Sequence, residues 1–185
     1  GEDLQQGVLA GIYRLRPAPG TDLPAVKLLG SGAILNEVVK AQAILEHQYG
    51  IAAEVWSVTS YTELRREALE VERWNLLHPL EKERVPFVSA QLCPSDGAFG
   101  GIFVAASDYL KALPDSIAKW LAMPLVSLGT DGFGRSGTRE ELRDFFEVDA
   151  RHVVLAALTA LSRHGMIASD IAQRAMLDLQ IDGES

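Results

Sequence analysis

The sequence predicts a single α/β domain, a three-layer sandwich in which helices cover both faces of a mainly parallel sheet of about five strands. Its 185 residues suit one domain of ordinary size. Apolar residues make up 48% of the chain and charged residues 23%, which is the balance of a globular protein with a sizeable core. Short apolar segments of strand type alternate with longer amphipathic segments of helix type, and this alternation is typical of a parallel sheet with crossover helices.

The strand-type segments are short and are bounded by glycine or proline. Two of them are separated by the turn-type cluster Cys93-Pro94-Ser95-Asp96-Gly97, and the sequence allows one antiparallel strand at this close pair. The other segments are separated by helices, so their strands should be parallel. The strand-type segments are 11–15, 25–29, 53–58, 85–90, 101–105 and 124–128.

The helix-type segments carry apolar residues every three or four positions. Two have capping boxes, Ser60 with Glu63 and Thr138 with Glu141, in which the side chains bond free amides of the first turn. One helix is apolar on nearly every face, from Ala150 to Ser162, so it should be largely buried. The helix-type segments are 33–49, 62–77, 107–120 with a break near Pro114, 138–146, 150–162 and 169–179.

Charge and composition limit the partners. Asp and Glu number 25 against 17 Lys and Arg, and the net charge of −8 argues against nucleic acid while suiting a basic protein partner. No apolar stretch approaches the roughly 20 residues that cross a bilayer, so we expect no membrane contact. The polar residues 1–10 do not resemble a signal peptide, and the single Cys93 points to a reducing compartment. We therefore expect a cytoplasmic domain over residues 11–185, preceded by an N-terminal extension or linker remnant.

Two glycine motifs are candidates for cofactor sites. Gly30-Ser31-Gly32 lies between a strand and a helix, as a dinucleotide-binding turn does, but Leu35 stands where the third glycine should be. Tight strand-to-helix packing is the favoured interpretation of this turn, and nucleotide binding is an alternative. Asp131-Gly132 resembles the start of a motif for thiamin diphosphate and magnesium. That motif needs a later asparagine, and Asn36 and Asn75 both precede Asp131, so it is absent.

Catalytic and metal-binding patterns are also missing from the sequence. The four histidines lack the spacing of a metal site, and one cysteine cannot complete a zinc set. Gly134-Arg135-Ser136-Gly137 is one residue shorter than the nucleophile elbow of a hydrolase. We therefore expect that this chain has no catalytic, cofactor-binding or metal-ligating residue of its own.

The glycine-rich loop 129–137 is the candidate for a contact surface. It follows the strand-type segment 124–128, and loops at the carboxyl ends of parallel strands commonly carry binding residues. Its glycines let another surface approach the backbone closely. The alternative is a loop held by its own hydrogen bonds, with Asp131 paired to Arg135. The candidate interface residues are Asp131, Phe133, Arg135, Ser136 and Arg139.

Several segments carry a resemblance to a known enzyme family. Leu28-Leu29-Gly30-Ser31-Gly32, its following helix and the strand Glu54-Val55-Trp56-Ser57-Val58-Thr59-Ser60 resemble the start of the C-terminal domain of transketolase-like enzymes. Later segments narrow the resemblance to the homodimeric bacterial pyruvate dehydrogenases, from about Gly11 to Leu179. These later segments are 72–79 (ERWNLLHP), 128–136 (LGTDGFGRS) and 145–150 (FFEVDA).

The resemblance implies that the chain is the C-terminal domain of an enzyme that decarboxylates pyruvate and transfers the acetyl group to a lipoyl group. In that family other domains bind thiamin diphosphate and Mg²⁺, so the resemblance implies no cofactor in this part. It implies as partners the rest of the same subunit, a second subunit of a homodimer, and the dihydrolipoyl acetyltransferase component through its basic peripheral subunit-binding domain. There are two alternatives: a stand-alone protein-binding module, and a weak nucleotide-binding domain that uses Gly30-Ser31-Gly32.

Overall fold

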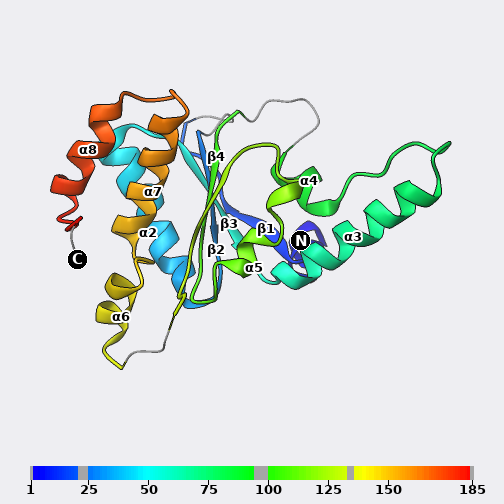
Figure 1. Cartoon of the computed structure of the whole chain (residues 1–185), viewed down its shortest axis with the longest axis horizontal. Helices are drawn as coiled ribbons and strands as arrows, with labels where there is room; N and C mark the ends of the chain where they lie inside the picture. The colour runs from blue at the N-terminus through cyan, green and yellow to red at the C-terminus, as the bar shows by residue number, and fades with distance from the viewer. Residues whose placement is uncertain (1, 21–24, 94–99, 133–135, 184–185) are drawn as a thin grey trace.

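The chain folds into three layers in the computed structural model, with a central sheet between two groups of helices (Figure 1). The structure describes residues 2–20, 25–93, 100–132 and 136–183. The predicted α/β architecture with a mainly parallel sheet is confirmed. Within the described ranges, no helix combines the length and the apolar character that a membrane span requires.

The sheet has five strands in the order β1-β3-β2-β4-β5. β2 pairs in parallel with β3 on one side and β4 on the other, and β4 pairs in parallel with β5. The strand order therefore reverses between β2 and β4, and the crevice outside their carboxyl ends is where parallel sheets usually place a binding site. The strands are β1 Ile12–Arg16, β2 Val26–Gly30, β3 Ala53–Val58, β4 Ile102–Ala106 and β5 Leu125–Leu128.

The first face of the sheet, on the left in Figure 1, is covered by α2, α7 and α8. α2 (Leu35–Tyr49) and α7 (Ala150–Arg163) pack against each other and on the sheet, and α8 (Ser169–Asp178) packs against α7. No residue of α7 from Ala150 to Ser162 is exposed, which confirms the predicted burial of this helix. Its buried side chains pack with those of Val26 and the other strand residues that point toward this face. Together they belong to the larger of the two apolar clusters in the described residues.

The second face is covered by shorter elements. α3 starts against the sheet, where Tyr61, Leu64 and Ala68 are buried, and then runs away from the body (Figure 1). Lys27 and Glu54 are paired neighbours on β2 and β3, and their side chains point into this face among a smaller apolar cluster. The elements are α1 Glu2–Ala10, α3 Tyr61–Leu77, α4 Phe87–Leu92, α5 Ala112–Asp115 and the 3₁₀ turn η2 Ala118–Trp120.

The strand predicted over residues 85–90 is wrong. This segment forms α4 after Pro86, and Val88 and Leu92, one helical turn apart, are both buried in the second face. A short apolar run does not by itself distinguish a strand from a buried helix, which explains the error. The antiparallel strand is instead β1, which pairs with β3.

The helix predicted over residues 107–120, with a break near Pro114, is observed as two short segments, α5 and η2. Pro114 lies within α5, near its end at Asp115, so the predicted break falls close to this proline. Residues 107–111 instead form an irregular segment after β4.

The carboxyl ends of the parallel strands lie together at the lower edge of the sheet in Figure 1. The 3₁₀ turn η1 (Gly32–Ile34) and the start of α2 are here, as is α6 (Arg139–Phe145), which connects the loop after β5 to α7. Gly30 makes the turn from β2 possible, because an added Cβ would lie 2.8 Å from the Leu35 Cδ1 atom. This edge positions the candidate interface loop.

Candidate functional site

The loop after β5 is fixed at its start to the segment that follows β4. The Thr130 amide donates to the Tyr109 carbonyl (2.9 Å), and the Thr130 hydroxyl donates to the Asp108 carbonyl (2.8 Å). Gly129 is needed for this approach, since an added Cβ would lie 2.5 Å from the Tyr109 carbonyl oxygen. The two segments are therefore held against each other at the carboxyl edge of the sheet.

Asp131 strengthens the same contact. Its side chain is exposed, and its carboxylate accepts a hydrogen bond from the Lys111 amide (2.9 Å). Gly132 follows with a φ of +105°, a conformation that glycine adopts readily and other residues rarely do. Phe133 and Arg135 lie outside the described residues. The predicted pairing of Asp131 with Arg135 therefore also lies outside them. The contact that the structure gives Asp131 is to the backbone of a neighbouring loop.

The far end of the loop is held by the start of α6. The Thr138 hydroxyl accepts a hydrogen bond from the Glu141 amide (3.3 Å), and the Glu141 carboxylate accepts one from the Thr138 amide (2.9 Å), so the predicted capping box is confirmed. Ser136 and Arg139 are both exposed, and none of the residues of α6 is buried. Both described ends of the loop are thus anchored while their side chains face solvent.

Two hollows adjoin this loop. An apolar hollow of about 550 Å³ lies beside its start and is lined by the exposed side chains of Tyr109 and Leu110, together with Leu113. A polar hollow of about 700 Å³ lies beside its end, between α6, the start of α7 and residues 180–182. Ser136 forms part of the wall of the polar hollow. The acidic residues in that wall are Glu141, Asp144, Glu147 and Asp182.

Among the described residues, one cluster beside the polar hollow has the spacing of a metal site, and two of its members, Asp144 and His152, line the hollow. Ligand atoms of Asp144, Asp149 and His152 lie within 4.8 Å of one another. The Arg151 guanidinium, however, pairs with Asp144 and, at 2.8 Å, with Asp149, while the His152 Nδ1 atom lies 2.7 Å from the Asp149 carboxylate. Arg151 thus supplies the positive charge that a cation would bring, and we interpret the cluster as an ion-pair network.

Asp149 is the electrostatic centre of that network and the N-cap of α7. Burial alone would raise the pKa of its carboxyl group, but hydrogen bonds from the His152 side chain and amide and from Arg151 outweigh burial and lower the pKa to about 2. The carboxylate is therefore ionised at neutral pH, and it stabilises the start of α7 next to the loop.

Glu37 on α2 ties the elements behind the loop together. Its buried carboxylate pairs with Lys40 (2.9 Å) and with Arg143 of α6 (3.1 Å), and it accepts a hydrogen bond from the Ala150 amide at the start of α7 (3.1 Å). Glu37 does not stand out in the sequence as a functional residue, because a lone glutamate on a helix is usually exposed. The available signal is its position four residues before Ala41, which places it on the buried stripe of α2.

The turn Gly30-Ser31-Gly32 is better explained by packing than by nucleotide binding. Gly32 has a φ of +55° and faces Asp108, whose Oδ1 atom would lie 3.2 Å from an added Cβ. A carboxylate at this position would repel a phosphate group. Together with the close approach of Leu35 to Gly30, this leaves the nucleotide-binding alternative without support.

The residues do not fit thiamin diphosphate and magnesium either. Asp131 bonds the Lys111 amide at the edge of the sheet, Asn36 is exposed on α2, and Asn75 lies on the outer half of α3, where it bonds Arg84. These side chains lie on different elements and do not converge on one ligand position.

Comparison with known proteins gives a consistent result. Residues 11–149 match the family model described as "Transketolase-like TK C-terminal domain". The chain is 44% identical over 181 residues to the pyruvate dehydrogenase E1 component of Pseudomonas aeruginosa, and 44% identical over 184 residues to that of Escherichia coli K12. These alignments cover 97% and 99% of this chain but 20% of each relative, so the chain spans about a fifth of their length.

Solved structures show the same fold. A transketolase from Leishmania mexicana superposes with a TM-score of 0.55 at 19% identity, over 85% of this chain and 19% of that one. A transketolase from Pichia stipitis, in complex with sedoheptulose 7-phosphate, gives a TM-score of 0.57 at 18% identity, over 89% of this chain and 21% of that one. At such identities the likeness concerns the fold alone.

Proposed function

The chain belongs to the family of transketolase-like C-terminal domains, and from this membership we propose that it is the C-terminal domain of a pyruvate dehydrogenase E1 component. The complete enzyme would decarboxylate pyruvate and transfer the acetyl group to the lipoyl group of a dihydrolipoyl acetyltransferase. Its thiamin diphosphate and Mg²⁺ would be bound by the other four-fifths of the polypeptide. This division is supported by the absence of a fitting residue set around Asp131 in the described part of the chain.

In this proposal the domain has an assembly role in a cytoplasmic homodimer. Residues 11–185 form the domain, and residues 1–10 connect it to the preceding part. The loop 129–137, together with Arg139 at the start of α6, contacts a neighbouring catalytic domain or the second subunit. The observation that carries this proposal is that the loop is anchored at both described ends while Asp131, Ser136 and Arg139 stay exposed. Ends that are already held in place lose little conformational entropy when the loop binds another surface.

The test is the substitution Arg135→Ala in the full-length protein and in the 185-residue chain. Because the proposal assigns the Arg135 side chain to a contact outside this domain, the unfolding free energy of the chain should change by less than about 0.5 kcal/mol. Dimerisation or pyruvate turnover of the full-length protein should weaken. Arg174→Ala is the matched control, because Arg174 is an exposed arginine on α8. A chain destabilised by several kcal/mol, with normal full-length dimers and turnover, would show that the loop is internal scaffolding.

The polar hollow supports a second contact within the same function. Four acidic residues line it, and the net charge of the chain is −8, so it suits the basic peripheral subunit-binding domain of the acetyltransferase. We expect this binding domain to bind the full-length protein at low ionic strength and to lose affinity steeply as salt increases. Absence of binding at low salt, or affinity that does not depend on salt, would exclude the contact.

A further inference from the structure

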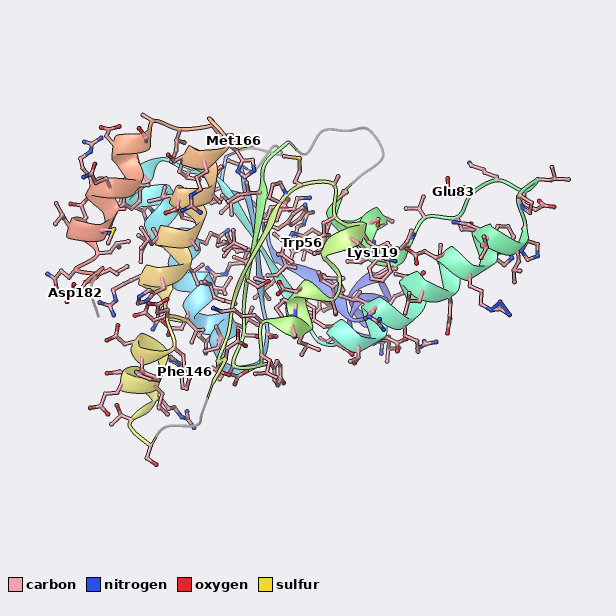
Figure 2. The ribbon with its side chains drawn as sticks, in the orientation of Figure 1. Trp56, Glu83, Lys119, Phe146, Met166 and Asp182 are labelled. Carbon is pink, nitrogen blue, oxygen red and sulfur yellow. The ribbon has the colours of Figure 1, made fainter. Side chains whose placement is uncertain are left out.

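The outer part of α3 and the segment that returns from it form an arm, residues 69–86, that projects from the body. Figures 1 and 2 show it extending to one side, with Glu83 on the segment that returns from its far end. None of the arm residues, all of which the structure describes, is buried. The arm therefore holds large apolar side chains in solvent, with Leu80 99% exposed and Leu76 79% exposed. Leu77 and Val85 beside them are exposed as well.

The arm is held in one shape by contacts of its own. The Asn75 side chain donates to the Arg84 carbonyl and accepts from the Arg84 amide, both at 2.9 Å. The His78 ring stacks on the Trp74 ring with centroids 4.4 Å apart, and the Arg84 guanidinium lies 3.6 Å from the centre of the same ring. These contacts tie the returning segment to the helix. The four apolar side chains are thus presented on a fixed frame.

The base of the arm is fastened to the body. The Phe87 amide donates to the Glu67 carboxylate (2.9 Å), and the Glu72 carboxylate accepts hydrogen bonds from the Lys119 ammonium and the Trp120 indole, both at 2.8 Å. An exposed apolar patch on an element that is already held in place is typical of a docking surface, because little conformational entropy is lost when the partner binds.

The chain start identifies the occupant. α1 is attached where α3 begins, through hydrogen bonds from the Thr59 hydroxyl to the Val8 carbonyl (2.8 Å) and from the Ser60 amide to the Gly11 carbonyl (3.2 Å). Leu4, Val8 and Leu9 of α1 are also exposed. Because the relatives are about five times as long and the family is a C-terminal domain, polypeptide that precedes residue 1 would arrive beside the base of the arm.

We propose that the arm clasps the catalytic part of the same polypeptide, with the leucines at its tip inserted into an apolar hollow of that part. The inference rests on the proposed function in one respect, namely that the chain is the C-terminal part of a longer enzyme. It adds a third contact surface to the loop after β5 and the polar hollow, and this surface is on the opposite side of the sheet from the polar hollow.

Hydrogen exchange tests the proposal on the full-length protein and on the 185-residue chain. Amides of residues 69–86 should exchange at least tenfold more slowly in the full-length protein. Leu80→Asp should abolish this difference, whereas the control Leu177→Asp, at an exposed leucine of α8, should preserve it. Equal exchange of the arm in both proteins would overturn the proposal. Pyruvate turnover by the full-length protein is measured in parallel, so that failure of the proposed function is recognised separately.

Cross-linking then distinguishes the possible occupants. A linker attached at Leu80→Cys in full-length protein assembled from isotopically light and heavy chains should join residues within one chain, at positions preceding this domain. Links between a light and a heavy chain would overturn the proposal in favour of a second subunit. Arm protection that appears in the 185-residue chain alone as its concentration rises would likewise overturn it, because a second copy would then be the occupant.

Discussion

The two faces of the sheet are built from different chemistry. On the first face, α2 and α7 bury an extended apolar cluster, with charged contacts such as those of Glu37 at its rim. On the second face the apolar cluster is smaller, and Lys27 and Glu54 are buried within it. The larger apolar cluster therefore belongs to the first face, whereas the smaller cluster of the second face encloses an ion pair, Lys27 with Glu54.

The buried pair shows what the second face gains from polar groups. The Lys27 ammonium lies 3.7 Å from the Glu54 carboxylate and donates to the Leu92 carbonyl at the end of α4 (2.8 Å), while the Trp56 indole donates to Glu54 (2.9 Å). Burial lowers the pKa of Lys27, and the Glu54 carboxylate offsets part of this effect. Because hydrogen bonds depend on direction, these contacts fix the position of α4 more specifically than a small apolar cluster would.

The largest effect should come from breaking this pair. Glu54→Leu leaves the Lys27 ammonium in the interior without its carboxylate, and we expect it to lower the unfolding free energy by about 3–5 kcal/mol, as other broken buried pairs do. Urea titration of the chain measures the change. The double variant Lys27→Met, Glu54→Leu is the control, and it should recover most of the loss. A double variant as unstable as Glu54→Leu would contradict a role for the charge pair.

The first face should instead respond to lost volume. Leu158 is fully buried in α7, so Leu158→Ala should lower the unfolding free energy by about 2–5 kcal/mol through lost burial and a residual cavity. Leu177→Ala is the matched control at an exposed leucine of the neighbouring α8, and its cost should stay below about 0.5 kcal/mol. A change below about 1 kcal/mol for Leu158→Ala would mean that this face does not depend on its apolar cluster.

The first face was also the easier one to predict from the sequence. Apolar periodicity places α2 and α7 within one or two residues of their observed bounds, because both helices bury a continuous stripe. On the second face the same reasoning predicts a strand where α4 forms, since a six-residue helix offers one turn of periodicity. It also cannot show that α3 leaves the body after Ala68, because a charged helix has the same pattern along a surface or in solvent.

The candidate site divides in a similar way. The position of the loop after β5 and the capping box at Thr138 follow from local sequence, so both are predictable. The contacts of Asp131 with Lys111 and of Glu37 with Arg143 join residues 20 and 106 positions apart. Such pairs depend on how the elements are placed in space, and no local pattern encodes them. The residues that are buried and charged are the ones that sequence reasoning assigns to the surface by default.

An intermediate, pH-dependent effect should come from Asp149 at the start of α7. Its folded pKa of about 2 lies below the ordinary 3.8, so its contribution is complete above about pH 5 and declines as the pH falls toward 2. Partial solvent screening reduces that contribution to about 1–2 kcal/mol. Asp149→Asn should lower the unfolding free energy by this amount at pH 6, and by roughly half as much at pH 3. The check is a series of urea titrations from pH 6 to pH 3, in which a difference that does not narrow would exclude the carboxylate charge as the cause.

The smallest effects compare two helix caps, one on each side of the sheet. Ser60 caps α3, whose first turns are buried in the second face, so Ser60→Ala should lower the global unfolding free energy by about 1 kcal/mol. Thr138 caps α6, which has no buried residue, so the loss of its cap should loosen this helix without unfolding the domain. We expect Thr138→Ala to change the global unfolding free energy by less than about 0.5 kcal/mol while amides of α6 exchange severalfold faster. If Thr138→Ala instead costs as much global stability as Ser60→Ala, then α6 unfolds only with the rest of the domain. In that case the loop before α6 would be part of the core structure that the first face supports.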